Sequence, residues 1–261
     1  MIRLALTAAA VLAAAAPTAA ATTQSWNGYH WARTGQLQIA VGNNLSATWS
    51  PYLAPAAAAW SADPVIDMVG VAGSSNSTCG PVFGGVQICS GNYGANGWLG
   101  YTNVWLGGGF IVQATIRLND HYFATTKYKT AAWRQATICH ELGHSLGLAH
   151  ADTSRSNANI GSCLDITNDV SGLAGGINGT LANTGPGAND FAALATIYAN
   201  TDSTQLYSTK PQYRAGAGLF IDGIDRDTAM IAVPEPQSWA LFIVGFGAVG
   251  AALRSRRRAF A

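Results

Sequence analysis

Apolar and polar residues alternate along two stretches of the chain, and this pattern predicts β-strands. Residues 36–41 alternate as in a strand with one buried face, and residues 111–118 repeat the pattern. Residues 65–71 form a continuous apolar run between turn residues, which is typical of a strand buried on both faces. We therefore expect three strands in the first half of the chain.

Apolar residues at helical spacing predict three helices. The first covers residues 45–62, although Pro51 and Pro55 disturb its start. A long helix is expected at 130–148 and a last one at 188–199. These elements make an α+β domain.

Residues 76–109 are rich in glycine and asparagine and contain only short apolar pieces. We assign no helix or strand to this part. The folded domain is expected to span residues 22–207, which is long enough to bury a sizeable core.

The first 21 residues have the composition of a secretory signal peptide. Arg3 precedes an alanine-rich apolar run, and small residues of the A-x-A type end it. A transmembrane helix is the alternative, but Pro17 argues against it. The mature chain should begin near Thr22, outside the cytoplasm.

The C-terminal segment, residues 234–261, has three parts. Pro234-Glu235-Pro236 is followed by an uncharged apolar stretch and then by a cluster of arginines. This order resembles the PEP-CTERM sorting signal of Gram-negative bacteria, which implies an exosortase-type sorting enzyme as a partner. The apolar helix would hold the precursor in the membrane before processing, and a plain membrane anchor is the alternative. Residues 208–233 would be a linker.

The two terminal segments account for much of the positive charge of the chain. They contain five of the 14 lysines and arginines and one of the 13 acidic residues, so the remaining body carries a formal charge of about −3. No basic stripe remains, so we expect no nucleic-acid partner.

Three of the five histidines lie in one short stretch, His140-Glu141-x-x-His144-x-x-Gly147-x-x-His150. Two histidines four residues apart share one face of a helix and can bind one metal ion together. A glycine that accepts positive φ ends the helix and returns the third histidine toward the same ion. Three histidines with an open fourth position are typical of a catalytic zinc site, and Glu141 is placed to act as a general base.

Chance histidines on a helix are the alternative, but the extended spacing makes this interpretation improbable. The stretch resembles the zinc signature of the metzincin metalloendopeptidases, and its flanks resemble matrixin-like bacterial peptidases. The resemblance implies His140, His144 and His150 as zinc ligands and Glu141 as the base. It also implies a twisted mixed sheet with a zinc-binding active-site helix and a C-terminal helix.

The same family has a tight turn with a methionine below the zinc. The matching residues here are 161–165, and Leu164 stands where methionine is expected. The methionine packs beneath the ligands without binding zinc, and leucine for methionine nearly conserves apolar volume. We expect this departure to affect the metal site little.

Four cysteines in an exported chain predict two disulfides, with three connectivities. Cys79 and Cys89 flank a short loop that a bond would close. If the family's turn lies beneath the zinc, a Cys139–Cys163 bond would tie the ligand helix to it. Cysteine ligation of zinc is less favoured, because three histidines already fill the protein positions.

The resemblance also suggests how a peptide substrate would bind. In metzincins the edge strand of the sheet lines the cleft, and the substrate lies antiparallel to it. Residues 111–118 would be that strand, with Gly107-Gly108-Gly109 leaving the rim open. An ordinary core strand is an equally good interpretation.

Several polar residues have weaker assignments. Asp152 is a candidate acceptor for a histidine N–H, with a solvated position as the alternative. His30 and His121 are expected to be structural or surface residues. Asp165 and Asp169 have oxygen atoms suited to calcium, but no loop of known spacing contains them, so calcium stays unassigned.

These observations predict a secreted zinc endopeptidase of the cell envelope or extracellular matrix, acting on a peptide or protein substrate. The alternative is a noncatalytic envelope protein that keeps zinc for stability. Glu141 argues against it, because a purely structural site needs no base. A zinc hydrolase acting on other bonds is a third hypothesis.

Overall fold

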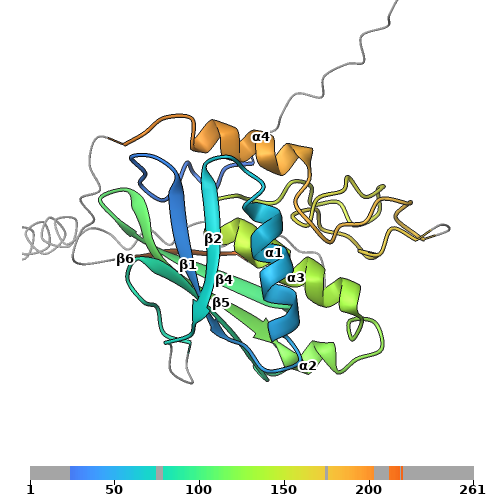
Figure 1. The fold of residues 1–261 in the computed structure, drawn as a ribbon. Helices are drawn as coiled ribbons and strands as arrows, with labels where there is room; N and C mark the ends of the chain where they lie inside the picture. The colour runs from blue at the N-terminus through green and yellow to red at the C-terminus, as the bar shows by residue number, and fades with distance from the viewer. Residues whose placement is uncertain (1–23, 75–78, 174–175, 203–211, 218, 220–261) are drawn as a thin grey trace, which may run out of the picture.

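The computed structural model describes residues 24–74, 79–173, 176–202, 212–217 and 219. Within these residues, six strands form one mixed sheet in the order β2-β1-β3-β5-β4-β6 (Figure 1). The strands are β1 (Leu37–Asn44), β2 (Ile66–Ala72), β3 (Gly85–Gly91), β4 (Gly100–Gly107), β5 (Phe110–Asn119) and β6 (Gln212–Ala217). Strands β2, β1, β3 and β5 run parallel, and β4 is antiparallel to both β5 and β6.

The predicted strands are present, but β2 lies at the edge of the sheet and exposes Val69 and Val71, so the expectation that it is buried on both faces is wrong. In β1, Leu37, Ile39 and Val41 are buried while Gln38 and Ala40 are exposed, as the alternation indicated. β5, in contrast, is buried on both faces over most of its length. It lies between β3 and β4, so of the two interpretations of residues 111–118 the core strand is confirmed and the edge strand is wrong. A strand with neighbours on both sides has no free backbone groups for a substrate.

The glycine-rich segment 76–109, to which the sequence assigned no helix or strand, contains two complete strands, β3 and β4. β3 carries glycine where it approaches its neighbour closely, because a Cβ on Gly85 would lie 2.9 Å from the Ala40 carbonyl oxygen. Gly108 and Gly109 have φ values of 63° and 95° and form the turn between β4 and β5. The glycines therefore serve close strand packing and a tight hairpin.

The helices are α1 (Leu53–Trp60), α2 (Asp120–Phe123), α3 (Ala131–Ser145) and α4 (Ala188–Ile197), and a short 3₁₀ turn covers Ser50–Tyr52. The helix predicted from residue 45 thus begins later than expected. Pro51 lies in the 3₁₀ turn, where its missing N–H costs nothing. α3 begins after Thr130, whose hydroxyl accepts a hydrogen bond from the Trp133 N–H at 3.3 Å.

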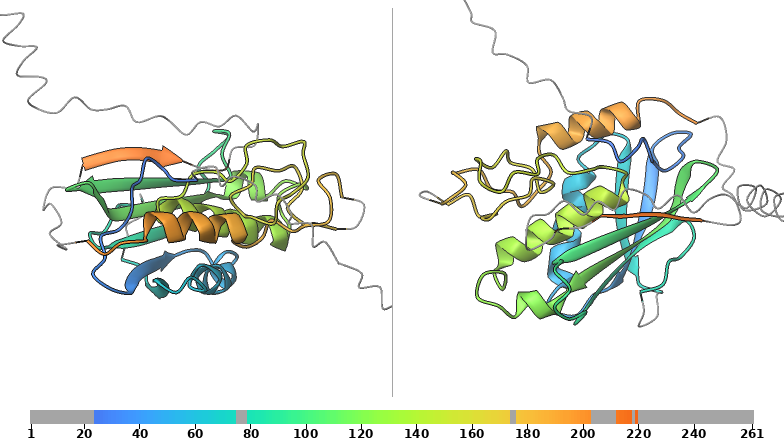
Figure 2. Two further views of the ribbon diagram at one scale, coloured as in Figure 1. Left: turned by 90° about the horizontal axis from the view of Figure 1, so that it is seen from above. Right: turned by 180° about the vertical axis from the view of Figure 1, so that it is seen from behind.

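α1 and α3 pack side by side on the sheet: α1 contacts β2, and α3 contacts β4 and β5 (Figure 1). The buried Trp60 of α1 joins the two helices, because its Nε1–H donates to the Cys139 carbonyl of α3 at 2.9 Å. α4 lies apart from them, after a long irregular segment (Figure 2). The α+β class, with a mixed sheet, a long helix bearing the histidine motif and a C-terminal helix, is confirmed.

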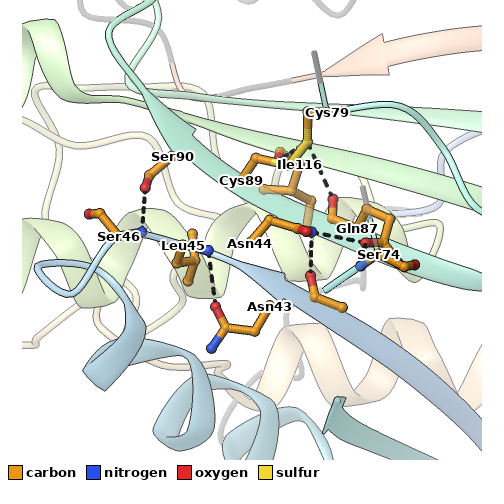
Figure 3. Close-up of a disulfide and its surroundings, with 11 residues drawn as sticks. Asn43, Asn44, Leu45, Ser46, Ser74, Cys79, Gln87, Cys89, Ser90 and Ile116 are labelled. Carbon is orange, nitrogen blue, oxygen red and sulfur yellow. Dashed lines mark hydrogen bonds between the residues drawn. A yellow bond between two sulfur atoms is a disulfide. The ribbon is translucent and has the colours of Figure 1, made fainter. Parts of the chain in front are cut away.

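A disulfide between Cys79 and Cys89 ties the segment after β2 to β3, with a Cα–Cα distance of 6.0 Å (Figure 3). Beside it, the Gln87 side-chain oxygen accepts hydrogen bonds from Asn44 Nδ2 at 2.9 Å and from the Ser74 N–H at 3.2 Å. The Cys79–Cys89 disulfide agrees with the pairing predicted from the sequence.

The segment expected to be a linker, 208–233, contributes β6 to the sheet. The predicted signal peptide (1–21), the apolar stretch and the arginine cluster lie outside the described residues. In the part of the chain that the structure describes, no helix has the length and apolar character needed to cross a membrane.

Candidate metal centre and its base

The three histidines of the motif meet at one point. His140 and His144 lie one turn apart on α3, and His150 approaches from the segment that follows the helix. The Nε2 atom of His140 is 3.0 Å from that of His144 and 3.1 Å from that of His150. Among the described residues, these three form the group whose ligand atoms could hold a metal ion, all within 4.8 Å of one another.

A glycine turn brings His150 back to the helix. α3 ends at Ser145, and Gly147 has a φ of 92°, in the left-handed region that favours glycine. A Cβ on Gly147 would also collide with the Tyr29 carbonyl oxygen. Both the conformation and the close approach therefore require glycine at this position.

Hydrogen bonds set the tautomers of two histidines. Nδ1 of His140 lies 2.8 Å from the Cys163 carbonyl oxygen, and Nδ1 of His144 lies 2.8 Å from that of Leu148. Since a carbonyl only accepts, each Nδ1 carries the proton, and in a neutral ring Nε2 then presents a lone pair. Burial, and then the neighbouring His144 and His150, lower the pKa of His140 well below its usual value, so the neutral form is favoured. Converging lone pairs repel one another unless a cation lies between them, and neutral imidazoles suit zinc.

Glu141 is fully buried and faces β4. One carboxylate oxygen accepts a hydrogen bond from the Thr102 hydroxyl at 2.7 Å, and the other accepts one from the backbone N–H of Leu219 at 3.2 Å. A Cβ on Gly100 would lie 2.6 Å from the second oxygen, so glycine leaves the space that the carboxylate occupies. The sequence pointed to Glu141 but not to Gly100, Thr102 or Leu219 around it, because no local pattern marks these residues.

The turn at 161–165 lies against the histidine helix. A Cys139–Cys163 disulfide joins the two with a Cα–Cα distance of 5.9 Å, as expected. Leu164 is fully buried and lies directly over Gly143 of α3, where an added Cβ would be 3.0 Å from a leucine methyl carbon. The residue that replaces the expected methionine thus supports the helix between the first two histidines.

Asp152 lies near the cluster, but its recorded bonds are local. Its two carboxylate oxygens accept hydrogen bonds from the Ser154 N–H at 2.7 Å and from Asn157 Nδ2 at 2.5 Å. The Nδ1 protons of His140 and His144 go to backbone carbonyls instead. The suggested hydrogen bond from a histidine N–H to Asp152 is therefore formed by neither His140 nor His144.

The other two histidines lie outside the cluster. His30 stacks edge-to-face on Phe110 and Tyr198, and its Nε2 is 3.5 Å from an Asp202 oxygen. His121 is exposed and stacks on Tyr122. Both positions are those of the structural or surface residues expected from the sequence.

The carboxylates considered for calcium are held by loop hydrogen bonds. Asp165 accepts from Asn183 Nδ2 at 2.8 Å and from the Ile160 N–H at 3.1 Å, and Asp169 accepts from the Ser171 N–H at 2.9 Å. Burial raises the pKa of Asp165 to about 6. These bonds order the segment between α3 and α4.

A hollow of about 800 Å³ lies between α1 and β2, away from the histidines. Its lining is mainly small and apolar and includes Asp67 but no histidine, cysteine or glutamate. It therefore offers no set of residues for metal or acid–base chemistry.

Comparisons with known proteins bear on the C-terminal segment and on the fold. Residues 232–258 match the PEP-CTERM protein-sorting motif, which indicates export and sorting to the cell envelope in Gram-negative bacteria. No curated protein sequence matches the chain.

Two similar solved structures have low sequence identity to the chain. Myroilysin is 13% identical with a TM-score of 0.38, over 68% of this chain and 99% of myroilysin. High choriolytic enzyme 1, a hatching enzyme zinc-protease from Oryzias latipes (Medaka fish), is 13% identical with a TM-score of 0.36, over 66% of this chain and 94% of that one.

Proposed function

We propose that this protein is an exported zinc-dependent endopeptidase. The observation that carries the proposal is the meeting of three imidazole Nε2 atoms, two of them on the helix that also carries the buried Glu141. His140, His144 and His150 would hold the zinc ion. A structural site would be closed by a fourth protein ligand, whereas the described residues bring three histidines together here.

A bound zinc ion would acidify a water molecule and polarise the substrate carbonyl. Glu141 takes a proton from the attacking water and delivers it to the nitrogen of the leaving amine. The Thr102 hydroxyl donates to one oxygen of Glu141 and so fixes the direction of the carboxylate. The carbonyls of Cys163 and Leu148 hold the imidazoles of His140 and His144 with Nε2 facing the ion.

The competing function is that of a noncatalytic zinc protein of the envelope. This noncatalytic function is supported by one departure from the family, namely that Leu164 stands where methionine is expected. Against it, Glu141 is a fully buried carboxylate, and burial of a charged group costs free energy that a purely structural zinc site does not require. We therefore favour the catalytic function over the noncatalytic one.

The test measures zinc binding and proteolysis in the same samples. The full chain and its Glu141→Ala variant are loaded with zinc and given a denatured protein substrate. We expect the parent to cleave it and a chelator to stop cleavage. The variant should bind zinc but lose at least about 100-fold in rate, as is typical when a general base is removed.

Two further variants serve as matched controls. His144→Ala should lose both zinc and activity, whereas His121→Ala, an exposed histidine outside the cluster, should keep both. If the parent binds zinc and cleaves no member of a broad peptide library, the noncatalytic function is favoured.

The C-terminal signal completes the proposal. An exosortase-type enzyme would recognise residues 232–258, which match the sorting motif, while their apolar stretch would hold the precursor in the membrane. Labelling the precursor in a host with and without the sorting enzyme tests this partner, because the tail should remain attached only without it.

A further inference from the structure

Strand β6 lies beside β4 at the outer edge of the sheet (Figure 2). It runs antiparallel to β4, with Ala217 opposite Thr102 and Gly216 opposite Asn103. Without β6, this edge of β4 would present unpaired N–H and C=O groups, to which an extended peptide can bind by adding a strand. A segment of the chain itself therefore occupies the position of an added peptide.

The end of this segment contacts the proposed general base. The backbone N–H of Leu219 donates to one carboxylate oxygen of Glu141 at 3.2 Å, and the Thr102 hydroxyl donates to the other at 2.7 Å. Leu219 is only 4% exposed, and its carbonyl accepts from the Leu99 N–H at 2.7 Å. A general base must come within hydrogen-bond distance of the proton that it takes, directly or through one water molecule. Glu141 is fully buried, so it cannot act on a substrate in this arrangement.

Backbone pairing holds β6 on the sheet, and the side chains at its end are small. Gly216 and Ala217 are both buried, and a Cβ on Gly216 would collide with the Tyr101 side chain. Small side chains bury little apolar area, so these two positions contribute little free energy of burial. β6 pairs with β4 alone and can leave without breaking any other strand pair. The segment thus fits the edge closely and is able to leave it.

We propose that residues 212–217 and Leu219 form an inhibitory segment, which blocks Glu141 and the edge of β4 until it leaves the sheet. This inference rests on the proposed peptidase activity, because it takes the blocked carboxylate to be the general base. Release of the inhibitory segment frees one oxygen of Glu141 and the backbone groups of β4 together. The alternative is a permanent strand, whose displacement would destabilise the fold without raising activity.

Gly216→Val is the diagnostic variant, because its side chain would push β6 away from Tyr101 and it changes neither the histidines nor Glu141. The zinc-loaded full chain and this variant are given a denatured protein substrate. The parent should cleave slowly, and the variant should cleave about ten times faster, because a larger fraction of its molecules is open. Gly35→Val is the control, because a Cβ on Gly35 meets nothing within 4 Å, and it should cleave at the parent's rate.

Hydrogen–deuterium exchange with mass spectrometry follows the inhibitory segment independently of activity. In the parent, paired amides of β4 and β6 should exchange slowly. In Gly216→Val, the amides of β6 should exchange at least about tenfold faster, while those of α3 and β5 stay protected. Loss of protection throughout the variant would identify β6 as a permanent strand and overturn the inference.

A peptide added to the Gly216→Val variant tests the same contact from the other side. A synthetic peptide with the sequence of residues 212–219 should inhibit the variant, because it can occupy the vacated edge of β4. The same peptide with valine in place of its first glycine, which corresponds to Gly216, should inhibit at least about tenfold more weakly. Equal inhibition by the two peptides would contradict the inference.

The outcomes separate the two proposals. If the parent cleaves as fast as Gly216→Val although β6 exchanges faster in the variant, the segment is not inhibitory and the peptidase stands. If the parent and Gly216→Val both bind zinc and cleave nothing, the proposed function itself fails. Cleavage by the variant at about ten times the parent's rate, with α3 still protected, supports both.

Discussion

Leu164 shows what the residue beneath the histidines has to provide. Its side chain is fully buried against Gly143, and its neighbour Cys163 supplies the carbonyl that orients His140. The position needs apolar volume rather than a sulfur atom. The departure from methionine is therefore compatible with an intact site.

Substitution at residue 164 tests this account. Leu164→Met conserves volume and should change the free energy of unfolding by less than about 1.5 kcal/mol. Leu164→Ala leaves a cavity beneath α3 and should cost about 2–5 kcal/mol. Chemical denaturation of the three zinc-loaded proteins measures both values. A large loss of stability in the methionine variant would show that the site depends on the branched shape of leucine.

At the scale of elements, the C-terminal end of α3 determines where the third histidine goes. The Ser145 carbonyl accepts from the Trp31 indole N–H at 2.8 Å, and that of Leu146 accepts from the Tyr198 hydroxyl at 2.9 Å. These bonds satisfy carbonyls that the helix itself cannot. Gly147 then turns the chain toward the metal centre.

Gly147→Ala should damage both the fold and the site. Alanine disfavours a φ of 92°, and its Cβ would meet the Tyr29 carbonyl, so we expect a loss of more than about 1 kcal/mol in unfolding free energy. Zinc affinity should fall as well, because His150 moves. Thermal melts and zinc titration measure the two effects. Gly35→Ala is the control, and equal results for the two variants would contradict the role of the turn.

At the scale of the whole molecule, a bound ion would add a further connection between two parts of the chain. It would tie α3, in the helical layer, to the irregular segment after it. The Cys139–Cys163 disulfide makes a second link between the same two parts. Zinc should therefore stabilise the global fold as well as enable catalysis.

Removal of zinc should lower Tm. A ligand at about 1,000 times its Kd stabilises by about 4 kcal/mol, which corresponds to roughly 10 °C for a domain of this size. The zinc-dependent increase should shrink as the pH falls, because protonated imidazoles do not bind zinc. Scanning calorimetry with zinc or chelator at several pH values measures this, with His150→Ala as the variant that should show no increase. A Tm unaffected by zinc at neutral pH would argue against the site.

The sequence by itself determined the cluster of three histidines, because they lie within one helix and the turn that follows it. Helical periodicity and one glycine suffice to bring such near neighbours together. It also indicated both cysteine pairs and three of the six strands in the described part of the chain.

Only the tertiary structure decided the order of the strands and what surrounds Glu141. Thr102 and Leu219 are 39 and 78 residues from Glu141 in the chain, yet both donate hydrogen bonds to it. Strand order depends on pairing between distant segments and on which faces are buried, and a local pattern records neither. For that reason β5 lies in the interior of the sheet, and β6, from a supposed linker, forms the edge beside the base.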